Sequence, residues 1–510
     1  MRKYPVLLIF LIIHVIASAQ NTITVIDDSS NITISKNIYG HFAEHLGHLI
    51  YGGLYVGESN KQIPNTEGIR NDIISALKKL KVPVLRWPGG CFADTYHWKD
   101  GIGKKEMRPS IVNTNWGGVT EDNSFGTHDF LNLCEQIGAE PYISGNVGSG
   151  SVQELADWVQ YVNFRGKSRM SDQRKDNGRS NPWSVKYWGI GNEAWGCGGN
   201  MTPEHYADVF RTYTTFMSNV SSTKIFKIAS GASDDDYHWT ETLMKSIPLQ
   251  MLEGLAIHHY SVIDWNHKGS AVNFSDEQYF LTMKKALQMD ELVSKHSAVM
   301  DKYDPLKKVA LVVDEWGGWY DVEEKTNPGF LYQQNSMRDA MIAGVTLNIF
   351  NNHAERVRMA NLAQVVNVLQ SVILTQETKM ITTPTYHVME MYNVHQNAKL
   401  IPLKIKSNEF GDGEQKLKSI SASASKDSTG TVHISIVNVN NKNSESVNLI
   451  LGKKYNTITG RILSSKNIQD HNSFDNPFLI IPVAFKAIKQ NDNEVQIQIP
   501  PFSVVVLELR

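Results

Sequence analysis

The chain has few cysteines, almost no net charge and almost no long apolar runs. Its 510 residues include only three cysteines, so a disulfide framework cannot replace a hydrophobic core. Fifty Lys and Arg residues oppose 52 Asp and Glu residues, and the net charge of −2 gives no electrostatic argument for binding nucleic acid or an acidic membrane. Hydrophobic residues make up 41% of the chain, which at this length predicts two globular domains.

The first twenty residues differ from the rest. Arg2 and Lys3 precede an apolar run over 6–16, and the small residues Ala17-Ser18-Ala19 follow it. This order predicts a signal peptide over 1–19, and therefore a secreted or periplasmic protein. The run is shorter than the roughly 18 residues of a membrane span, which disfavours an anchor. No later segment reaches that length, so we expect no membrane association after the signal is removed.

Two apolar segments end on a glutamate with a tryptophan close by. Residues 186–196 (KYWGIGNEAWG) run from a strand-like stretch into Asn192 and Glu193, and residues 309–316 (VALVVDEW) end at Glu315 and Trp316. Hydrolysis of a glycosidic bond requires one carboxylic acid and one opposing carboxylate. A lone glutamate at a strand end is usually structural, but two in matched aromatic settings favour a catalytic pair facing a sugar-sized cleft.

Strand and helix patterns alternate through most of the chain. This alternation predicts parallel βα units, and eight of them predict an α/β fold of the (β/α)₈ TIM-barrel type with the active site at the carboxyl ends of the strands. We expect polar loops over 98–126 and 165–180. The predicted strands cover 38–44, 82–86, 141–144, 186–193, 225–230, 255–260, 309–315 and 345–350.

The pattern changes near residue 400, where short alternating strands separated by Asn, Gly, Lys and Asp turns begin. These strands predict a C-terminal antiparallel β-sandwich with a jelly-roll-like form. We therefore expect a catalytic barrel over 38–395 and a sandwich over 396–510. The strands within 20–37 are expected to join the sandwich.

Several motifs resemble those of a known family. Gly191-Asn192-Glu193 and Asp314-Glu315-Trp316 look like the acid/base and nucleophile motifs of retaining barrel glycosidases. Together with four further motifs they resemble the α-L-arabinofuranosidases of glycoside hydrolase family 51. The resemblance runs from about residue 38 to the C-terminus, and it is specific only in the barrel. The further motifs are 40–45 (GHFAEH), 86–92 (RWPGGCF), 96–101 (YHWKDG) and 364–368 (QVVNV).

The resemblance implies an exo-acting enzyme that releases terminal α-L-arabinofuranose from arabinoxylan or arabinan chains with retention of configuration. It makes Glu193 the acid/base and Glu315 the nucleophile, with no cofactor and no metal. Homo-oligomeric assembly is also expected from the family. The residues expected to bind the sugar are Glu44, Cys91, Trp116, Asn192, His258, Tyr260, Trp319 and Gln364.

Cys91 departs from the family pattern, because many relatives have an asparagine there that contacts sugar. A thiol is a weak hydrogen-bonding group, so the backbone at this position is expected to bind instead. Cys197 follows the acid/base segment, and both cysteines are expected near the barrel mouth. We therefore hypothesise a Cys91–Cys197 disulfide, whereas Cys134 is expected in the core.

Four other interpretations are weighed against the sequence. The glutamate pair alone does not choose a sugar, so a β-xylosidase or an endo-glucanase on the same barrel would also fit. A non-catalytic carbohydrate-binding protein is disfavoured because both glutamates and their aromatic neighbours are present. Glu44 could be a structural partner of Arg86 as well as a sugar ligand. The cluster of His41, Glu44, His45 and His48 has metal-binding residue types, but it lacks the spacing of a metal site.

Overall fold

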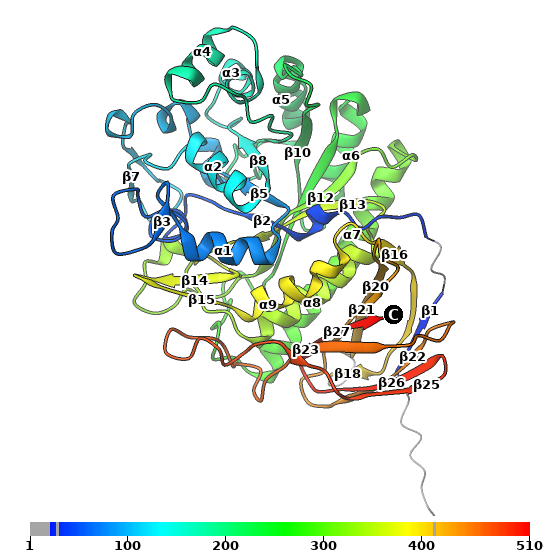
Figure 1. Cartoon of the computed structure of the whole chain (residues 1–510). Coiled ribbons are helices and arrows are strands. Elements are labelled where there is room, and N and C mark those ends of the chain that lie inside the picture. The colour runs from blue at the N-terminus through cyan, green and yellow to red at the C-terminus, as the bar shows by residue number, and fades with distance from the viewer. Residues whose placement is uncertain (1–20, 27–29, 412–414) are drawn as a thin grey trace, which may run out of the picture.

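The computed structural model describes residues 21–26, 30–411 and 415–510. Its largest unit is a closed barrel of eight parallel strands, confirming the predicted fold class (Figure 1). In chain order the barrel strands are β2 (Gly40–Phe42), β5 (Val84–Trp87), β8 (Glu140–Gly145), β9 (Tyr187–Ile190), β10 (Phe226–Ser233), β11 (Gly254–Ser261), β12 (Ala310–Gly318) and β13 (Val357–Ala363).

Helices surround the barrel, and most begin with a side-chain cap. Ser151, Thr202 and Ser275 each accept a backbone N–H from the first turn, as expected for capping residues. The helices are α1 (Asn71–Leu80), α2 (Thr127–Ile137), α3 (Val152–Asn163), α4 (Arg169–Asp176), α5 (Pro203–Phe216), α6 (Tyr237–Ser246), α7 (Asp276–Tyr303), α8 (Met337–Asn352) and α9 (Pro384–Tyr392). None of the helices in the described part of the chain is both long and apolar enough to cross a membrane.

The predicted eighth strand is wrong. Residues 345–350 belong to α8, and the eighth strand is β13. The error has a physical reason: α8 packs against the barrel on one side and against sandwich strands on the other, so all but the last of its residues are buried. A helix buried on every face has no amphipathic period, and its apolar run looks like a buried strand.

The predicted loops also contain regular structure. Residues 169–176 of the basic insertion form α4, which Ser168 caps. The loop over 98–126 includes a hairpin of β6 (Ile111–Val112) and β7 (Thr120–Glu121) that carries Trp116. Two further hairpins pair β3 (Asn65–Thr66) with β4 (Ile69–Arg70) and β14 (Ile373–Gln376) with β15 (Lys379–Thr382).

The C-terminal region packs two sheets around a second apolar core. The five-stranded sheet has the order β17-β1-β22-β26-β25, and β1 is parallel to β22 while the other pairings are antiparallel. Its strands are β1 (Asn21–Val25), β17 (Leu403–Lys406), β22 (Glu445–Ile450), β25 (Ile488–Asn491) and β26 (Glu494–Ile499). The N-terminal strand thus lies beside strands more than 370 residues later in the sequence (Figure 1).

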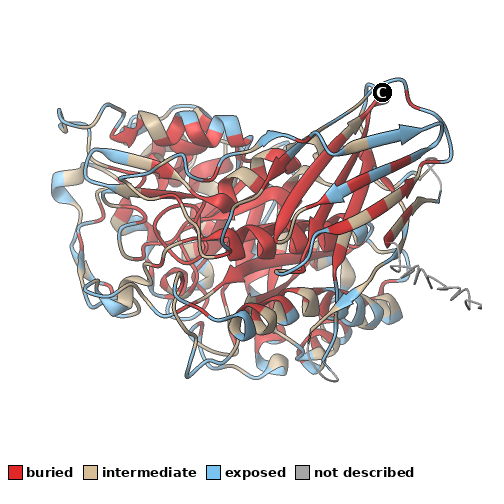
Figure 2. Ribbon diagram, turned by 90° about the horizontal axis from the view of Figure 1, so that it is seen from below, coloured by how far each residue is buried: buried red, intermediate tan, exposed pale blue. Residues whose placement is uncertain are grey.

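The six-stranded sheet faces the barrel through α8. Asn348 and Asn351 of that helix each donate to a serine of β20, at 3.2 and 3.1 Å. One buried cluster includes residues of the barrel, of α8 and of this sheet. Figure 2 shows buried residues, in red, through the interior of the molecule. The strands are β16 (Lys399–Ile401), β20 (Ile420–Lys426), β21 (Val432–Asn438), β27 (Ser503–Leu509), β23 (Ile458–Leu463) and β24 (Val483–Ala484), and β18 (Glu409–Phe410) and β19 (Leu417–Lys418) form a separate hairpin.

Candidate active site

The carboxyl ends of the barrel strands enclose a small cavity of about 70 Å³. Its size limits it to one small ligand, such as a single sugar ring. Both predicted catalytic glutamates line it, and so do seven of the eight predicted binding residues. His258 is the exception, because it contacts both glutamates from behind the cavity wall. The seven are Glu44, Cys91, Trp116, Asn192, Tyr260, Trp319 and Gln364.

The two glutamates face each other across the cavity. Glu193 follows β9 and Glu315 lies within β12, and a carboxylate oxygen of each lies within 4.8 Å of the other and of a ring nitrogen of His258. Retaining glycosidases place their carboxyl groups about 5–5.5 Å apart, whereas inverting enzymes need about 6.5–9.5 Å to admit a water molecule. The separation therefore fits direct attack by one carboxylate on a bound sugar.

Glu315 is held by two donors. Arg86 Nη1 donates to Oε1 at 2.9 Å, and the Tyr260 hydroxyl donates to Oε2 at 2.7 Å. Burial alone would raise the pKa of Glu315, but the charges of His258 and Arg86 outweigh it and lower the pKa below its usual value. These contacts thus favour the ionised form of Glu315.

Glu193 has a different environment. His258 Nδ1 lies 2.9 Å from its Oε1, and Cys197 Sγ lies 3.6 Å from its Oε2. Although burial lowers the pKa of His258, the charges of Glu315 and Glu193 raise it above its usual value. A protonated His258 then lies between the two carboxylates and reduces their repulsion.

The backbone around Glu193 is fixed by its neighbours. Glu193 itself has φ of 39°, in the left-handed region that non-glycine residues rarely occupy. Buried Asp94 accepts the Asn192 N–H at 2.8 Å, and Ser230 Oγ accepts the Ala194 N–H at 3.1 Å. These two bonds hold the unusual backbone in place and aim the carboxylate into the cavity.

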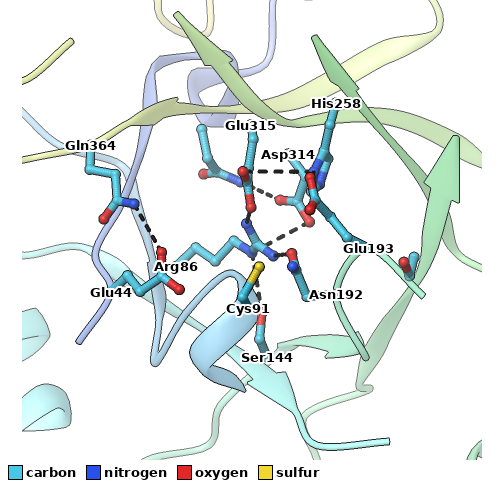
Figure 3. A network of polar contacts seen from close by, with 12 residues as sticks. Glu44, Arg86, Cys91, Ser144, Asn192, Glu193, His258, Asp314, Glu315 and Gln364 are labelled. Atoms are coloured by element: carbon cyan, nitrogen blue, oxygen red, sulfur yellow. Dashed lines mark hydrogen bonds and ion pairs between the residues drawn. The ribbon is translucent and has the colours of Figure 1, made fainter. Parts of the chain in front are cut away.

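Arg86 has a central role that its sequence motif did not reveal. Its guanidinium contacts Glu315, donates to Asn192 Oδ1 at 2.6 Å and to Ser144 Oγ at 3.2 Å, and lies 3.5 Å from Asp314 (Figure 3). The suggested pairing of Arg86 with Glu44 is wrong, because none of these contacts involves Glu44. One signal was available: Arg86 is a charged residue inside an otherwise apolar strand, and buried charges require partners.

Glu44 lies on the opposite wall and accepts three hydrogen bonds. Phe92 N–H and Trp116 Nε1 donate to Oε1 at 3.0 and 2.8 Å, and Gln364 Nε2 donates to Oε2 at 3.0 Å. Burial, followed by the charge of Glu315, raises the pKa of Glu44 to about 7. A Cβ at Gly90 would come within 2.7 Å of both Glu44 oxygens, so glycine lets the backbone pass close over this carboxylate.

Cys91 and Cys197 are bonded to each other, as hypothesised from the sequence. The bond joins the segment after β5 to the segment that follows Glu193, and Cys91 forms part of the cavity wall. A bridged sulfur carries no proton, so the contact between Cys197 and Glu193 is not a hydrogen bond. Cys134 is free and buried, in keeping with a core position.

The histidines of the 41–48 segment do not converge with Glu44 on one point. Among the described residues, the groups whose ligand atoms lie within 4.8 Å of one another are Cys91, Glu193 and Cys197, and Glu193, His258 and Glu315. His41 is fully buried, which lowers its pKa to about 3. His45 stacks on Phe92 with ring centroids 4.7 Å apart. This segment therefore packs beneath the cavity.

Two family models match the chain. Residues 76–278 match an α-L-arabinofuranosidase 1 domain, and residues 314–503 match an α-L-arabinofuranosidase C-terminal domain. An intracellular exo-α-L-arabinofuranosidase of Bacteroides ovatus is 50% identical over 98% of both chains. The prediction of a secreted or periplasmic location is contradicted by this relative, which is named as intracellular. The predicted signal peptide, 1–19, lies outside the described residues.

Solved structures agree with these matches. The glycoside hydrolase family 51 arabinofuranosidase of Xanthomonas axonopodis pv. citri is 47% identical, with a TM-score of 0.95 over 96% of this chain and 100% of that one. The α-L-arabinofuranosidase of Thermotoga maritima, solved with arabinose, is 30% identical, with a TM-score of 0.83 over 96% and 99%. The chain belongs to the α-L-arabinofuranosidases of glycoside hydrolase family 51.

Proposed function

We propose that the protein is an exo-acting enzyme that removes terminal non-reducing α-L-arabinofuranosyl units with retention of configuration. The observation that carries the proposal is the approach of Glu193 and Glu315 within 4.8 Å across a cavity the size of one sugar. A cavity that accommodates one sugar ring favours the end of a chain over its interior. Family membership selects arabinofuranose over other sugars.

Glu315 is proposed as the nucleophile in the first step. Its carboxylate attacks the anomeric carbon while Glu193, as the acid, gives its proton to the departing glycosidic oxygen. The bond from the anomeric carbon to the leaving alcohol breaks as the bond to Glu315 forms. Arg86 and Tyr260 keep the attacking carboxylate ionised and in a fixed orientation.

Glu193 acts as the base in the second step. It takes a proton from water, whose oxygen attacks the anomeric carbon and releases Glu315 as a carboxylate. Charge on Glu315 disappears when the covalent intermediate forms, so Glu193 no longer experiences repulsion in its ionised form. The same pair can therefore serve both steps.

The remaining cavity residues are proposed to bind the sugar. Asn192 accepts an Arg86 N–H at its Oδ1, and its Nδ2, which lies 3.8 Å from Cys197 Sγ, would donate to a sugar hydroxyl. Glu44 and Gln364 are paired at 3.0 Å on the other wall, where they would bind further hydroxyls, while Trp116 and Trp319 would contact the ring. Arabinoxylan or arabinan as natural polymer, homo-oligomeric assembly and the domain limits of 38–395 and 396–510 stay predictions.

Comparison of two aryl glycosides tests the sugar assignment. We expect rapid release from aryl α-L-arabinofuranoside and a kcat/KM at least about 100-fold lower on aryl β-D-xyloside, since a pocket built for one ring rejects a differently placed hydroxyl. Preference for the xyloside would favour the alternative of a β-xylosidase. Hydrolysis of neither would favour a binding protein.

A further inference from the structure

Trp265 is the one tryptophan among the large apolar side chains that are exposed in the described part of the chain. It is 52% exposed and lies in the segment between β11 and α7. Tryptophan carries a large apolar surface that is unfavourable in water, so an exposed ring near a ligand cavity indicates a contact surface.

Trp265 is connected to the cavity by a row of aromatic rings. Its ring meets Trp319 edge-on with centroids 5.4 Å apart, and Trp319 meets Tyr260 edge-on at 5.1 Å. Tyr260 in turn donates its hydroxyl to Glu315. Trp319 and Tyr260 line the cavity whereas Trp265 does not, so Trp265 is the outermost ring of a row that starts at the proposed nucleophile.

The loop that carries Trp265 is held in place. Asp264 Oδ1 accepts the Asn266 and His267 N–H groups at 2.7 and 3.2 Å. Gly269 donates its N–H to the Asp321 carboxylate at 3.1 Å, and the Asp321 N–H returns a bond to the Gly269 carbonyl at 2.9 Å. The ring is therefore held beside the segment that bears Trp319.

The base of the same loop is fixed from inside the protein. The buried guanidinium of Arg338 donates to the Ser270 and Ala271 carbonyls at 2.9 and 3.2 Å. It is sandwiched between the rings of Phe274 and Tyr320, each 3.7 Å from its centre. An ordered loop loses little entropy when a ligand binds to it, which makes Trp265 a preorganised surface.

We propose that Trp265, beside Trp319, forms a stacking surface for a sugar ring of the leaving-group chain, outside the cavity that holds the terminal arabinose. This inference rests on the proposed function. The cavity accommodates one ring, so the chain beyond the cleaved bond must extend past its mouth. The apolar face of a neutral sugar ring matches an exposed indole, and the surface selects substrates by leaving-group length.

Substrates of two lengths test this surface. For Trp265→Ala in the full chain, we expect kcat/KM on aryl α-L-arabinofuranoside to stay within about 2-fold of wild type, since an aryl group is too short to need the outer ring. On α-L-arabino-oligosaccharides of four units, kcat/KM should fall about 3- to 10-fold, mostly through KM. Trp265→Phe keeps an aromatic ring at this position, so its loss of kcat/KM on the oligosaccharides should be smaller than that of Trp265→Ala.

Phe478→Ala is the matched control, because Phe478 is an exposed aromatic residue (74%) in the segment between β23 and β24 and does not line the cavity. It should leave both substrates unaffected. If Trp265→Ala leaves the ratio of the two kcat/KM values unchanged, with or without an equal loss on both substrates, the stacking surface is overturned but the proposed function is not. Failure of the wild-type protein to hydrolyse the aryl arabinofuranoside would instead overturn the proposed function, and this inference with it.

Discussion

Glu315 and Glu193 occupy similar sequence patterns but different surroundings. Glu315 lies within β12, has a side chain that is 7% exposed, and accepts hydrogen bonds from Arg86 and Tyr260. Glu193 lies just beyond the end of β9, has a side chain that is 19% exposed, and has His258 as its polar side-chain partner.

This difference in surroundings agrees with the different roles proposed for the two carboxylates. A carboxylate beside a buried guanidinium stays ionised and in one orientation, which suits attack on carbon. A carboxylate that has a single polar side-chain partner and more access to water suits the proposed general acid and base. These surroundings therefore support different proposed roles for two motifs that look alike in the sequence.

The largest expected effect is the loss of the nucleophile. Glu315→Ala should lower kcat/KM on every substrate by about 10⁴-fold or more, because no other group can form the covalent intermediate. Initial rates on aryl and oligosaccharide substrates measure this loss, and an unchanged circular dichroism spectrum shows that the fold is retained. A loss below about 10-fold would mean that Glu315 is not the attacking group.

The effect of removing Glu193 on kcat should depend on the leaving group. Glu193→Ala should lower kcat about 10²- to 10⁴-fold on oligosaccharides, whose leaving alcohol needs a proton, and less on an activated aryl glycoside. Azide should restore turnover of the aryl substrate and give arabinosyl azide with the α configuration. If azide instead rescued Glu315→Ala and that variant gave the α-configured azide, the two assignments would be reversed.

Removal of Arg86 should lower stability and raise the pKa of Glu315. Arg86→Met leaves buried Asp314 without its cation and Glu315 with only His258 beside it, and loss of a buried partner costs about 3–5 kcal/mol of stability. Without that charge the pKa of Glu315 rises, so the acidic limb of the kcat/KM profile should move to higher pH. Urea unfolding and pH–rate profiles measure both. Arg461→Met, which removes an exposed pair with Glu390, is the control and should change neither.

Tyr260→Phe should have a smaller effect of the same kind. It removes one hydrogen bond to an ionised group, worth about 1.5–3 kcal/mol, and should reduce kcat by about 10- to 100-fold. The acidic limb of the kcat/KM profile should again move to higher pH, because the Tyr260 hydroxyl favours the ionised form of Glu315. Tyr303→Phe removes a hydroxyl that bonds Glu241 at the surface and should be neutral. Equal losses in the two variants would contradict the role of Tyr260.

The smallest effect on activity is expected from the disulfide. The Cys91→Ser, Cys197→Ser double variant should lose about 2–4 kcal/mol of stability, because the bond constrains the unfolded chain across 106 residues. Its kcat/KM should fall less than that of Tyr260→Phe, since Asp94 and Ser230 still hold the Glu193 backbone. A reductant should destabilise the wild type and leave the double variant unchanged. Three reactive thiols in unfolded, unreduced wild type, where one is expected, would contradict the bond.

The sequence predicted the parts of this site that follow from the barrel. Strands that end on a glutamate bring Glu193 and Glu315 to one face, so their meeting required only the fold class. Family motifs then identified residues such as Glu44 and Gln364, which line the same cavity.

Other features depend on contacts between distant segments, which local patterns do not encode. Arg86 was recognised within a motif, but its four partners come from two other barrel strands, β8 and β12, and the segment after β9. The eighth strand was misplaced because α8 is buried by both the barrel and the sandwich. No local sequence pattern identifies Trp265, because its neighbour Trp319 lies 54 residues later in the chain.

Trapping the covalent intermediate distinguishes the two proposed roles, in which Glu315 bonds to the sugar while Glu193 moves protons. A 2-deoxy-2-fluoro-α-L-arabinofuranosyl compound with a good leaving group should slow the second step and trap the intermediate. Mass spectrometry of the digested protein should then find one added sugar per chain, on the peptide that contains Glu315. A label on the Glu193 peptide, or burst-free turnover with inverted product, would contradict the account.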